Sequence, residues 1–372
     1  MRVTQPAVLV GAYDWDEKLL PRSEFDARIK EAFAELNGSG VAGLVVYGNK
    51  VDNAALAWLT NFAPKIESGT ALVTSDGKVR IHGSGSPHMM VNAKLLTWTE
   101  DVRPQRDIGK HISDWAAEIG PGPLAFWASD AMPADLMPRI NASLQGRELR
   151  DMTSTLDTLL LKKSPVAVAL IRGACGMLEI AVSTLRQSVK NGGTAREAAV
   201  AAETAAYAAG AQDVRILISL SKGGTPTAID YPEGTKIDPL LAYVAVRHST
   251  YWADGALTLS ASPSATFTRT QDALKAMIAT AKAGATVAQL SAAAQEKLSG
   301  LTLHPVAQKA VNGIGLSLSE TEADHAPVLE LEEGRVYSVR AGARGGEGDA
   351  ALFSAVILAK ANQAEVLWSP LA

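Results

Sequence analysis

The sequence predicts an α+β fold with two domains. The first, residues 1–155, is a smaller α/β layer domain, and the second, residues 156–372, is a curved antiparallel sheet covered by helices. A length of 372 residues favours two domains. Strand and helix patterns alternate in the first part, which is typical of an α/β layer domain. In the second part, two long helical patterns with their own start signals interleave with several strand patterns.

The N-terminal elements follow from local patterns. Residues 28–36 (RIKEAFAEL) space their apolar side chains as a helix does. The run GLVVYGN at 43–49 is rich in β-branched residues and predicts a strand that ends at its Gly-Asn pair. Residues 70–83 form two strand patterns around Asp76-Gly77, a dipeptide typical of a hairpin turn. A further strand pattern occupies residues 122–129.

The C-terminal elements begin after a boundary expected between residues 153 and 165. The pattern is then helical through Gln187. Thr194 with Glu197, and Thr286 with Gln289, fit capping boxes, in which the two side chains satisfy free backbone donors at a helix start. The two helices end at Gly210 and Gly300, residues that readily adopt a left-handed stop. Strand patterns cover residues 241–247, 249–260, 335–342, 352–360 and 364–369.

Bulk properties exclude several classes of function. A formal net charge of −4 gives no electrostatic basis for binding nucleic acid or an anionic membrane. No run of about 18 apolar residues occurs, so no membrane span is expected. The first twenty residues lack the apolar core of a signal peptide. The one cysteine, Cys175, cannot form an internal disulfide, which fits a reducing compartment. We therefore expect a cytoplasmic protein.

Several segments, in this order, resemble the creatinase / aminopeptidase P / prolidase family. RIKEAFAEL, GLVVYG and WLTNF resemble its non-catalytic domain, and LLLKKSP followed by IRGACGMLEIA resembles its domain junction. YWADGALTLS, NGIGL and LEEGRVYSVRAG resemble the strands of its metal site. The resemblance covers nearly the whole chain. It implies a pita-bread fold for residues 156–372 and a creatinase-like N-terminal domain for residues 1–155.

Residue by residue, the resemblance implies a metal site whose ligands have been replaced. The family spaces two Asp residues eleven apart; Asp254 matches the second, and Tyr243 holds the place of the first. The family's His before Gly-Ile-Gly-Leu is Asn312 here, and its Glu near the end of the LEEGRVYSV strand is Arg340. Three further family positions, a second His, the last Glu and an upstream catalytic His, fall at Ser319, at about Phe353 and at about Asp230.

This set of residues argues against a metal. Divalent ions need several carboxylate and imidazole ligands in one shell, and Asp254 alone does not supply them. The guanidinium of Arg340 cannot be deprotonated and would repel the ion. We therefore expect no metal ligands and no other cofactor. Arg340 would instead face Asp254 or Glu320, because an acidic group buried without a counter-charge is costly.

The candidate catalytic residues are Asp254, Glu320 and His248, and each has a structural alternative. The two carboxylates are either general acid/base groups or structural partners of a cation. His248 lies six residues before Asp254 and is either a proton shuttle or a loop histidine. Arg340 would clamp a ligand carboxylate or form an internal ion pair. The remaining candidates for substrate binding are Tyr243, Tyr251, Asn312 and Asp230.

Two functions follow. The first is a metal-free member that is not a metallopeptidase and that serves as a small-molecule-binding or partner subunit, either as a homodimer or as a heterodimer with a related subunit. Its ligand would be small and polar or would carry a carboxylate. The second, implied by the resemblance to creatinase, is a metal-independent hydrolase or lyase that acts on a small polar C–N compound by acid/base catalysis.

Overall fold

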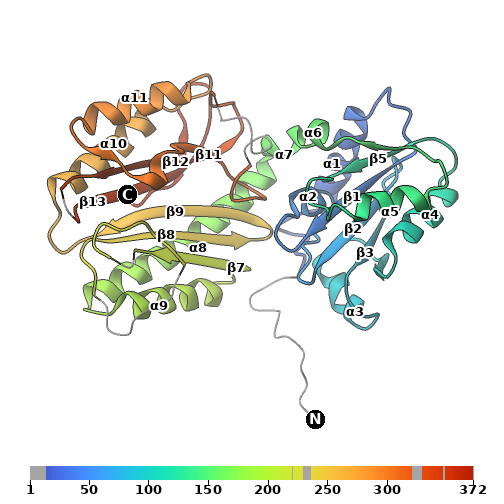
Figure 1. Cartoon of the computed structure of the whole chain (residues 1–372), viewed down its shortest axis with the longest axis horizontal. Coiled ribbons are helices and arrows are strands. Elements are labelled where there is room, and N and C mark those ends of the chain that lie inside the picture. The colour runs from blue at the N-terminus through green and yellow to red at the C-terminus, as the bar shows by residue number, and fades with distance from the viewer. Residues whose placement is uncertain (1–13, 220, 229–235, 321–328, 347, 372) are drawn as a thin grey trace, which may run out of the picture. The chain divides into compact units, whose positions relative to one another are not determined.

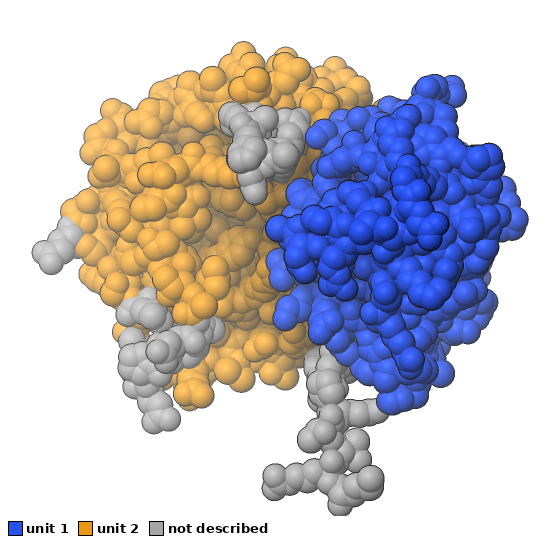
Figure 2. All heavy atoms as spheres, turned by 45° about the vertical axis from the view of Figure 1, so that its right-hand side comes forward, with its two compact units in different colours: residues 1–9, 13–160 blue, residues 10–12, 161–372 orange. Residues whose placement is uncertain are grey.

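The structure is a computed structural model that describes residues 14–219, 221–228, 236–320, 329–346 and 348–371. These residues divide into two compact units, coloured blue and orange in Figure 2. The first unit ends at Leu160 and the second begins at Leu161, a few residues after the boundary set from the sequence. The predicted α+β class is confirmed, because each unit combines helices with its own sheet structure.

The first unit is built on a six-stranded mixed sheet (Figure 1). Its strands are β1 (Gly43–Asn49), β2 (Ser68–Val73), β3 (Val79–Gly83), β4 (Val102–Pro104), β5 (Leu124–Trp127) and β6 (Leu149–Asp151). They lie in the order β4-β3-β2-β1-β5-β6. The pairs β1–β2 and β2–β3 are antiparallel, and the pairs β3–β4, β1–β5 and β5–β6 are parallel. The predicted turn at Asp76-Gly77 joins β2 to β3, with Gly77 at a φ of 85°.

Helices cover this sheet. They are α1 (Arg22–Glu35), α2 (Ala54–Thr60), α3 (Met89–Ala93), the 3-10 turn η1 (Lys94–Leu96), α4 (Ile108–Glu118), α5 (Leu136–Ser143) and α6 (Thr153–Leu156). The short helix α7 (Thr158–Leu161) follows in the chain and includes the boundary between the units. Ile112 and Trp115 of α4 pack with Val45 of β1 and Phe126 of β5 in one buried cluster. One part of the core of the unit therefore lies between the central strands and α4.

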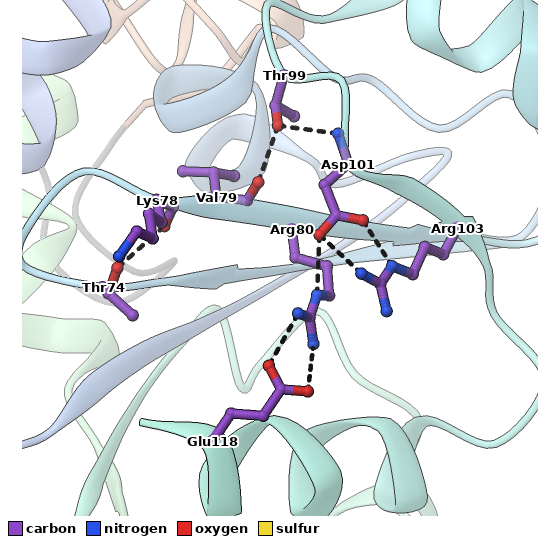
Figure 3. Close-up of polar contacts among 8 residues, drawn as sticks. All are labelled: Thr74, Lys78, Val79, Arg80, Thr99, Asp101, Arg103 and Glu118. Carbon is purple, nitrogen blue, oxygen red and sulfur yellow. Dashed lines mark hydrogen bonds and ion pairs between the residues drawn. The ribbon is translucent and has the colours of Figure 1, made fainter. Parts of the chain in front are cut away.

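A network of ion pairs joins the edge of this sheet to α4 (Figure 3). Arg80 of β3 donates to both carboxylate oxygens of Glu118, at 3.2 and 2.9 Å, and to Asp101 at 3.0 Å. Arg103 of β4 also pairs with Asp101. The hydrogen bonds from Arg80 lower the pKa of Glu118. Burial acts to raise the pKa of Asp101, but the hydrogen bonds from Arg103 and Arg80 lower it overall.

The second unit contains two antiparallel sheets. Its strands are β7 (Asp213–Ile218), β8 (Leu240–His248), β9 (Tyr251–Leu259), β10 (Thr302–Leu303), β11 (Val311–Gly313), β12 (Val336–Arg344), β13 (Ala350–Leu358) and β14 (Glu365–Trp368). One sheet has the order β7-β8-β9. The other has the order β10-β12-β13-β14, and β11 also pairs with β12.

Hydroxyl groups join the two sheets where β9 packs against β13. The backbone N–H of Ala256 donates to Ser354 Oγ at 2.6 Å. The hydroxyl of Thr258 accepts from the N–H of Leu352 at 2.8 Å and donates to the carbonyl of Leu352 at 3.2 Å. These side chains take the place of a backbone ladder, so the two sheets form the curved antiparallel layer that the sequence predicts.

Helices cover this layer too. They are α8 (Pro165–Lys190), α9 (Ala195–Ala208), α10 (Ala265–Thr280), α11 (Val287–Lys297) and the 3-10 turn η2 (Pro305–Ala307). Both predicted capping boxes are confirmed, at the starts of α9 and α11. Helix α8 begins where Ser164 Oγ accepts from the N–H of Ala167, with Pro165 in its first turn. Helix α8 packs on β8 and β9, and α10 packs on β12 and β13.

By length and composition, α8 is the one helix among the described residues that would be able to cross a membrane. Core helices of soluble proteins meet the same criterion, and α8 buries one face that includes Ile171, Leu178 and Leu185. The expectation of no membrane span therefore depends on this packing and stays a prediction.

Candidate functional site

Three strands bring Tyr243, Asp254 and Arg340 together. On β8 and β9, Tyr243 pairs with Ala256 and Ala245 pairs with Asp254, so the side chains of Tyr243 and Asp254 lie on one face. The phenol of Tyr243 donates to Asp254 Oδ2 at 3.0 Å. Arg340, on β12, donates to the same oxygen through Nη2 at 2.6 Å. The ion pair that the sequence analysis names as one alternative for these two residues is present in the structure.

Burial strengthens this contact. The side chain of Asp254 is 0% exposed and that of Arg340 is 12% exposed. Burial opposes the charge on Arg340, but the Asp254 carboxylate outweighs it, and the pKa of the guanidinium is raised. Burial and the same carboxylate raise the pKa of Tyr243 well above its usual value. At neutral pH, Arg340 is therefore a fixed cation and Tyr243 a neutral hydrogen-bond donor.

The register of β12 and β13 assigns a further residue to this face. Arg340 pairs directly with Ser354, and cross-strand partners point to the same side of a sheet. Phe353 points to the opposite face of β13, and its ring centroid lies 5.1 Å from that of Phe267 on α10. The expected position of the last family Glu, at about Phe353, stays a prediction; at this end of β13 the residue that shares the face of Arg340 is Ser354. Because β13 lies between β12 and β9, the small serine leaves room for Arg340 to reach Asp254.

Asn312 and Ser319, which hold the places of two histidines, bind each other. Ser319 Oγ donates to Asn312 Oδ1 at 3.0 Å, and Asn312 Nδ2 donates to the carbonyl of Leu318 at 2.6 Å. Asn312 is 2% exposed and pairs across β11 and β12 with Ser338. These polar side chains hold the loop after β11 in place, and Ser338 lies on the same face as Arg340.

Glu320 has a cation of its own. Its carboxylate forms an ion pair with Lys163, and the two side chains are 4% and 2% exposed. The other carboxylate oxygen accepts from the N–H of Leu316 at 2.6 Å. A Cβ at Gly315 would lie 2.5 Å from Glu320 Oε1, so glycine is required beside this pair. Glu320 thus ties the loop after β11 to the segment before α8.

The structure does not bring His248 or Tyr251 to Asp254. These two residues pair with each other at the end of the β8–β9 hairpin. Because side chains alternate along a strand, both lie on the face opposite to Asp254. The ring of His248 packs on α8, where a Cβ at Gly173 would lie 2.6 Å from it, and burial lowers the pKa of His248. Asp230, the remaining candidate, lies outside the described residues.

The side chains at this site do not fit a divalent metal ion. Five side chains define this site, and Asp254 is the single carboxylate among them. The guanidinium of Arg340 already binds it. The other three are Tyr243, Asn312 and Ser354. Hard and borderline cations need several anionic or imidazole donors. In the part of the chain that the structure describes, no three His, Cys, Asp or Glu side chains gather as metal ligands would.

Three atoms on this face are buried without a hydrogen-bond partner among the described residues. They are Asp254 Oδ1, Arg340 Nε and Ser338 Oγ. Buried polar atoms usually have a partner, so each of these atoms keeps the capacity to bind a further polar group. Three residues of this region, Ser338, Ser354 and Lys163, are not predicted from the sequence. The signal that would have found the two serines is their even spacing along strands that already carry site residues.

The model of metallopeptidase family M24 matches residues 169–359, about half of the chain. Among curated proteins, no sequence matches this chain.

Several solved structures are similar over nearly their whole length. An X-Pro aminopeptidase from Thermotoga maritima MSB8 is 17% identical, with a TM-score of 0.72, 92% of this chain covered and 97% of that chain. A Xaa-Pro dipeptidase from Bacillus anthracis is 16% identical, with a TM-score of 0.70 and coverages of 93% and 97%. A prolidase from Pyrococcus horikoshii OT3 is 17% identical, with a TM-score of 0.69 and coverages of 92% and 97%. At such identities the likeness concerns the fold.

Proposed function

Because the chain belongs to metallopeptidase family M24, we propose that it is a member in which an internal ion pair replaces the metal centre. Its function is then to bind a small polar ligand or a partner subunit, and it does not hydrolyse peptides as a metallopeptidase. The observation that carries this proposal is the 2.6 Å contact between the Arg340 guanidinium and the buried carboxylate of Asp254.

Electrostatics support the proposal. A metal ion at Asp254 would have to displace Arg340, whose side chain is 12% exposed and cannot lose its charge. A buried guanidinium would then lie next to a divalent cation, which is an arrangement that a low-dielectric site strongly disfavours. Tyr243, Asn312 and Ser354 are neutral and do not compensate for that repulsion.

Acid/base catalysis on a small C–N compound is the alternative, and the contacts favour binding over it. A general acid or base must reach the proton that it transfers and must be free to change its charge. Asp254 is held by Arg340, and Glu320 is held by Lys163. His248 faces α8 on the other side of the hairpin. None of the three candidates is therefore poised for proton transfer.

Metal content and peptidase activity test this proposal. The purified chain is dialysed against zinc, manganese or cobalt and then against buffer, and its metal content is measured by elemental analysis. We expect substoichiometric metal and no hydrolysis of Xaa-Pro dipeptides with or without added metal. An Asp254→Asn variant is the matched control. Stoichiometric metal that this variant loses would overturn the proposal, whereas metal that the variant retains would lie elsewhere on the protein.

The assembly state is part of the same proposal. We expect a homodimer, or a heterodimer with a related subunit, because a binding subunit acts through its partner. Light scattering on the purified chain would give the mass of the particle. A monomer that also captures no related subunit in a pulldown would leave only the small-ligand form of the proposal.

A further inference from the structure

The first unit has a crevice of about 600 Å³ at the carboxyl ends of two parallel strands. These strands, β1 and β5, are neighbours in the sheet. Loop 49–53 leads from β1 to α2, and loop 128–135 leads from β5 to α5. In open sheets with parallel strands, ligands bind at such an edge. The crevice lies outside residues 169–359, the part that the family model matches.

Asn49, which lines the crevice at the end of β1, connects loop 49–53 to loop 128–135. Its Oδ1 accepts from the N–H groups of Val51 and Asp52, at 2.7 and 2.8 Å, within loop 49–53. Its Nδ2 donates to the carbonyl of Ala131 in the opposite loop, at 2.8 Å. One side chain thus spans the loops and holds the crevice in shape, so a ligand would meet a largely pre-formed site.

Glu67, at the rim, has an unfavourable backbone conformation. Its φ is 42°, in the left-handed region that glycine and asparagine adopt more readily than glutamate. Its side chain is exposed and lines the crevice. A residue that keeps a strained backbone where its side chain faces a cavity points to a role for that side chain.

The lining combines hydroxyls, an apolar wall and both signs of charge. Tyr47 and Ser68, both largely buried, form the floor. Met132 and Leu136 supply the apolar wall. Glu67, Asp135 and Arg139 stand at the rim. Arg139 and Asp135 are 3.9 Å apart and well exposed, so this weak pair leaves the guanidinium available to another carboxylate.

We propose that this crevice binds a small zwitterion of the amino-acid type. Its carboxylate would meet Arg139, its ammonium group would meet Glu67, and its apolar side chain would lie on Met132 and Leu136. A simple anion would face two rim carboxylates, and a simple cation would face Arg139. Loops 49–53 and 128–135 contain no glycine, which argues against the close backbone approach that a phosphate needs.

Calorimetric titration of the full chain tests this inference. The probes are L-leucine, L-methionine and L-phenylalanine, together with N-acetyl-L-leucine, which lacks the ammonium group, and L-leucinamide, which lacks the carboxylate. We expect saturable binding of at least one free amino acid at one site, and binding of each leucine derivative about fivefold or more weaker than that of leucine. No binding of any free amino acid up to about 10 mM would overturn the inference. Equal binding of either derivative would also overturn it.

Rim variants place the binding at this crevice. Arg139→Gln and Glu67→Gln should each weaken binding about fivefold. Arg106→Gln, an exposed arginine of the same unit that does not line the crevice, is the matched control and should leave binding unchanged. Binding that both rim variants leave unchanged would overturn the assignment.

Glu67→Asn separates a functional role of this residue from a structural one. Asparagine tolerates the left-handed backbone better than glutamate, so the unfolding midpoint should rise. The rim loses a negative charge at the same time, so amino-acid binding should fall. A higher midpoint with undiminished binding would exclude Glu67 from ligand recognition and overturn its part in the inference.

Discussion

One cluster in each unit of this chain arranges similar charged groups in a different way. In the first unit, Arg80, Arg103, Asp101 and Glu118 form a network whose side chains are between 18% and 54% exposed (Figure 3). In the second unit, the pairs Arg340–Asp254 and Lys163–Glu320 have side chains that are at most 12% exposed. The chemical groups are alike, and the surrounding medium differs.

That difference decides what each cluster contributes. Exposed ion pairs typically contribute between about 0 and 1 kcal/mol, because water competes for both partners. A buried pair gains little net stability either, but removing one partner leaves an unpaired charge in a low-dielectric site. Each buried charge therefore depends on its partner, and under the proposed function the Arg340–Asp254 pair excludes a metal ion, whereas the exposed network leaves the surface free to vary.

The largest expected effect tests the buried side of the comparison. Arg340→Met should lower the free energy of unfolding by about 3–5 kcal/mol, because Asp254 stays buried without a cation. The double variant Arg340→Met with Asp254→Leu removes both charges and should recover most of that loss. Urea denaturation of the single and double variants measures both effects.

Arg103→Met is the matched control for this experiment, because it removes an arginine from the exposed network. Its side chain is 49% exposed, so the loss should stay below about 1 kcal/mol. If Arg340→Met cost no more than Arg103→Met, burial would not be what distinguishes these two clusters.

Acid pH extends the comparison to buried groups that are neutral. Burial lowers the pKa of His82, on β3, and of His304 to about 4. Both are neutral in the folded chain, whereas an unfolded chain binds protons near the ordinary value of 6.5. This contribution to stability is therefore present above pH 6.5 and is lost as the pH drops toward 4, by at most about 3 kcal/mol for each histidine.

Urea titrations between pH 7 and pH 4 measure this loss, and His82→Phe separates it from the titration of carboxylates. His82 stacks on His111 with ring centroids 4.2 Å apart, and a phenyl ring would keep that packing. The variant should lose less stability on acidification than the wild type. Identical pH dependence in the two proteins would contradict a neutral, buried His82.

The smallest expected effect tests the exposed side. Arg80→Gln removes the central cation of the surface network and should lower the free energy of unfolding by about 1 kcal/mol at low salt. At about 1 M salt the difference should largely disappear, because mobile ions screen exposed charges. Thermal unfolding at the two salt concentrations measures it. A larger loss that salt leaves unchanged would place this network with the buried pairs.

The sequence predicted the fold best where a few neighbouring residues are enough to define an element. Thr194 with Glu197 and Thr286 with Gln289 define helix starts by contacts three residues apart, and both are confirmed. Helix α10 is not predicted, although Ser264 caps it through the N–H of Phe267. A hydrophobic residue stands where a capping box has Glu or Gln, and the helix depends on its packing against β12 and β13.

The candidate site was predictable only in part. Asp254 and Arg340 lie in strands with strong patterns, so their pairing was open to inference from charge alone. Lys163 is 157 residues from Glu320 in the sequence, and no local pattern links them. Ser354, which shares the face of Arg340, was not predicted although it follows Phe353 directly, and because side chains alternate, one residue exchanges the two faces of a strand. The same alternation of side chains places His248 on the face opposite to Asp254.

The join between β9 and β13 has an evolutionary consequence. The backbone hydrogen bonds between two ordinary strands tolerate almost any substitution, since every residue except proline carries the same backbone donor and acceptor. Here the connection depends on the hydroxyls of Thr258 and Ser354. A single codon change at Thr258 or Ser354 is therefore enough to remove or restore hydrogen bonds between the two sheets. Selection is thus able to act on the curvature of this layer through side chains, as it is not in an ordinary sheet.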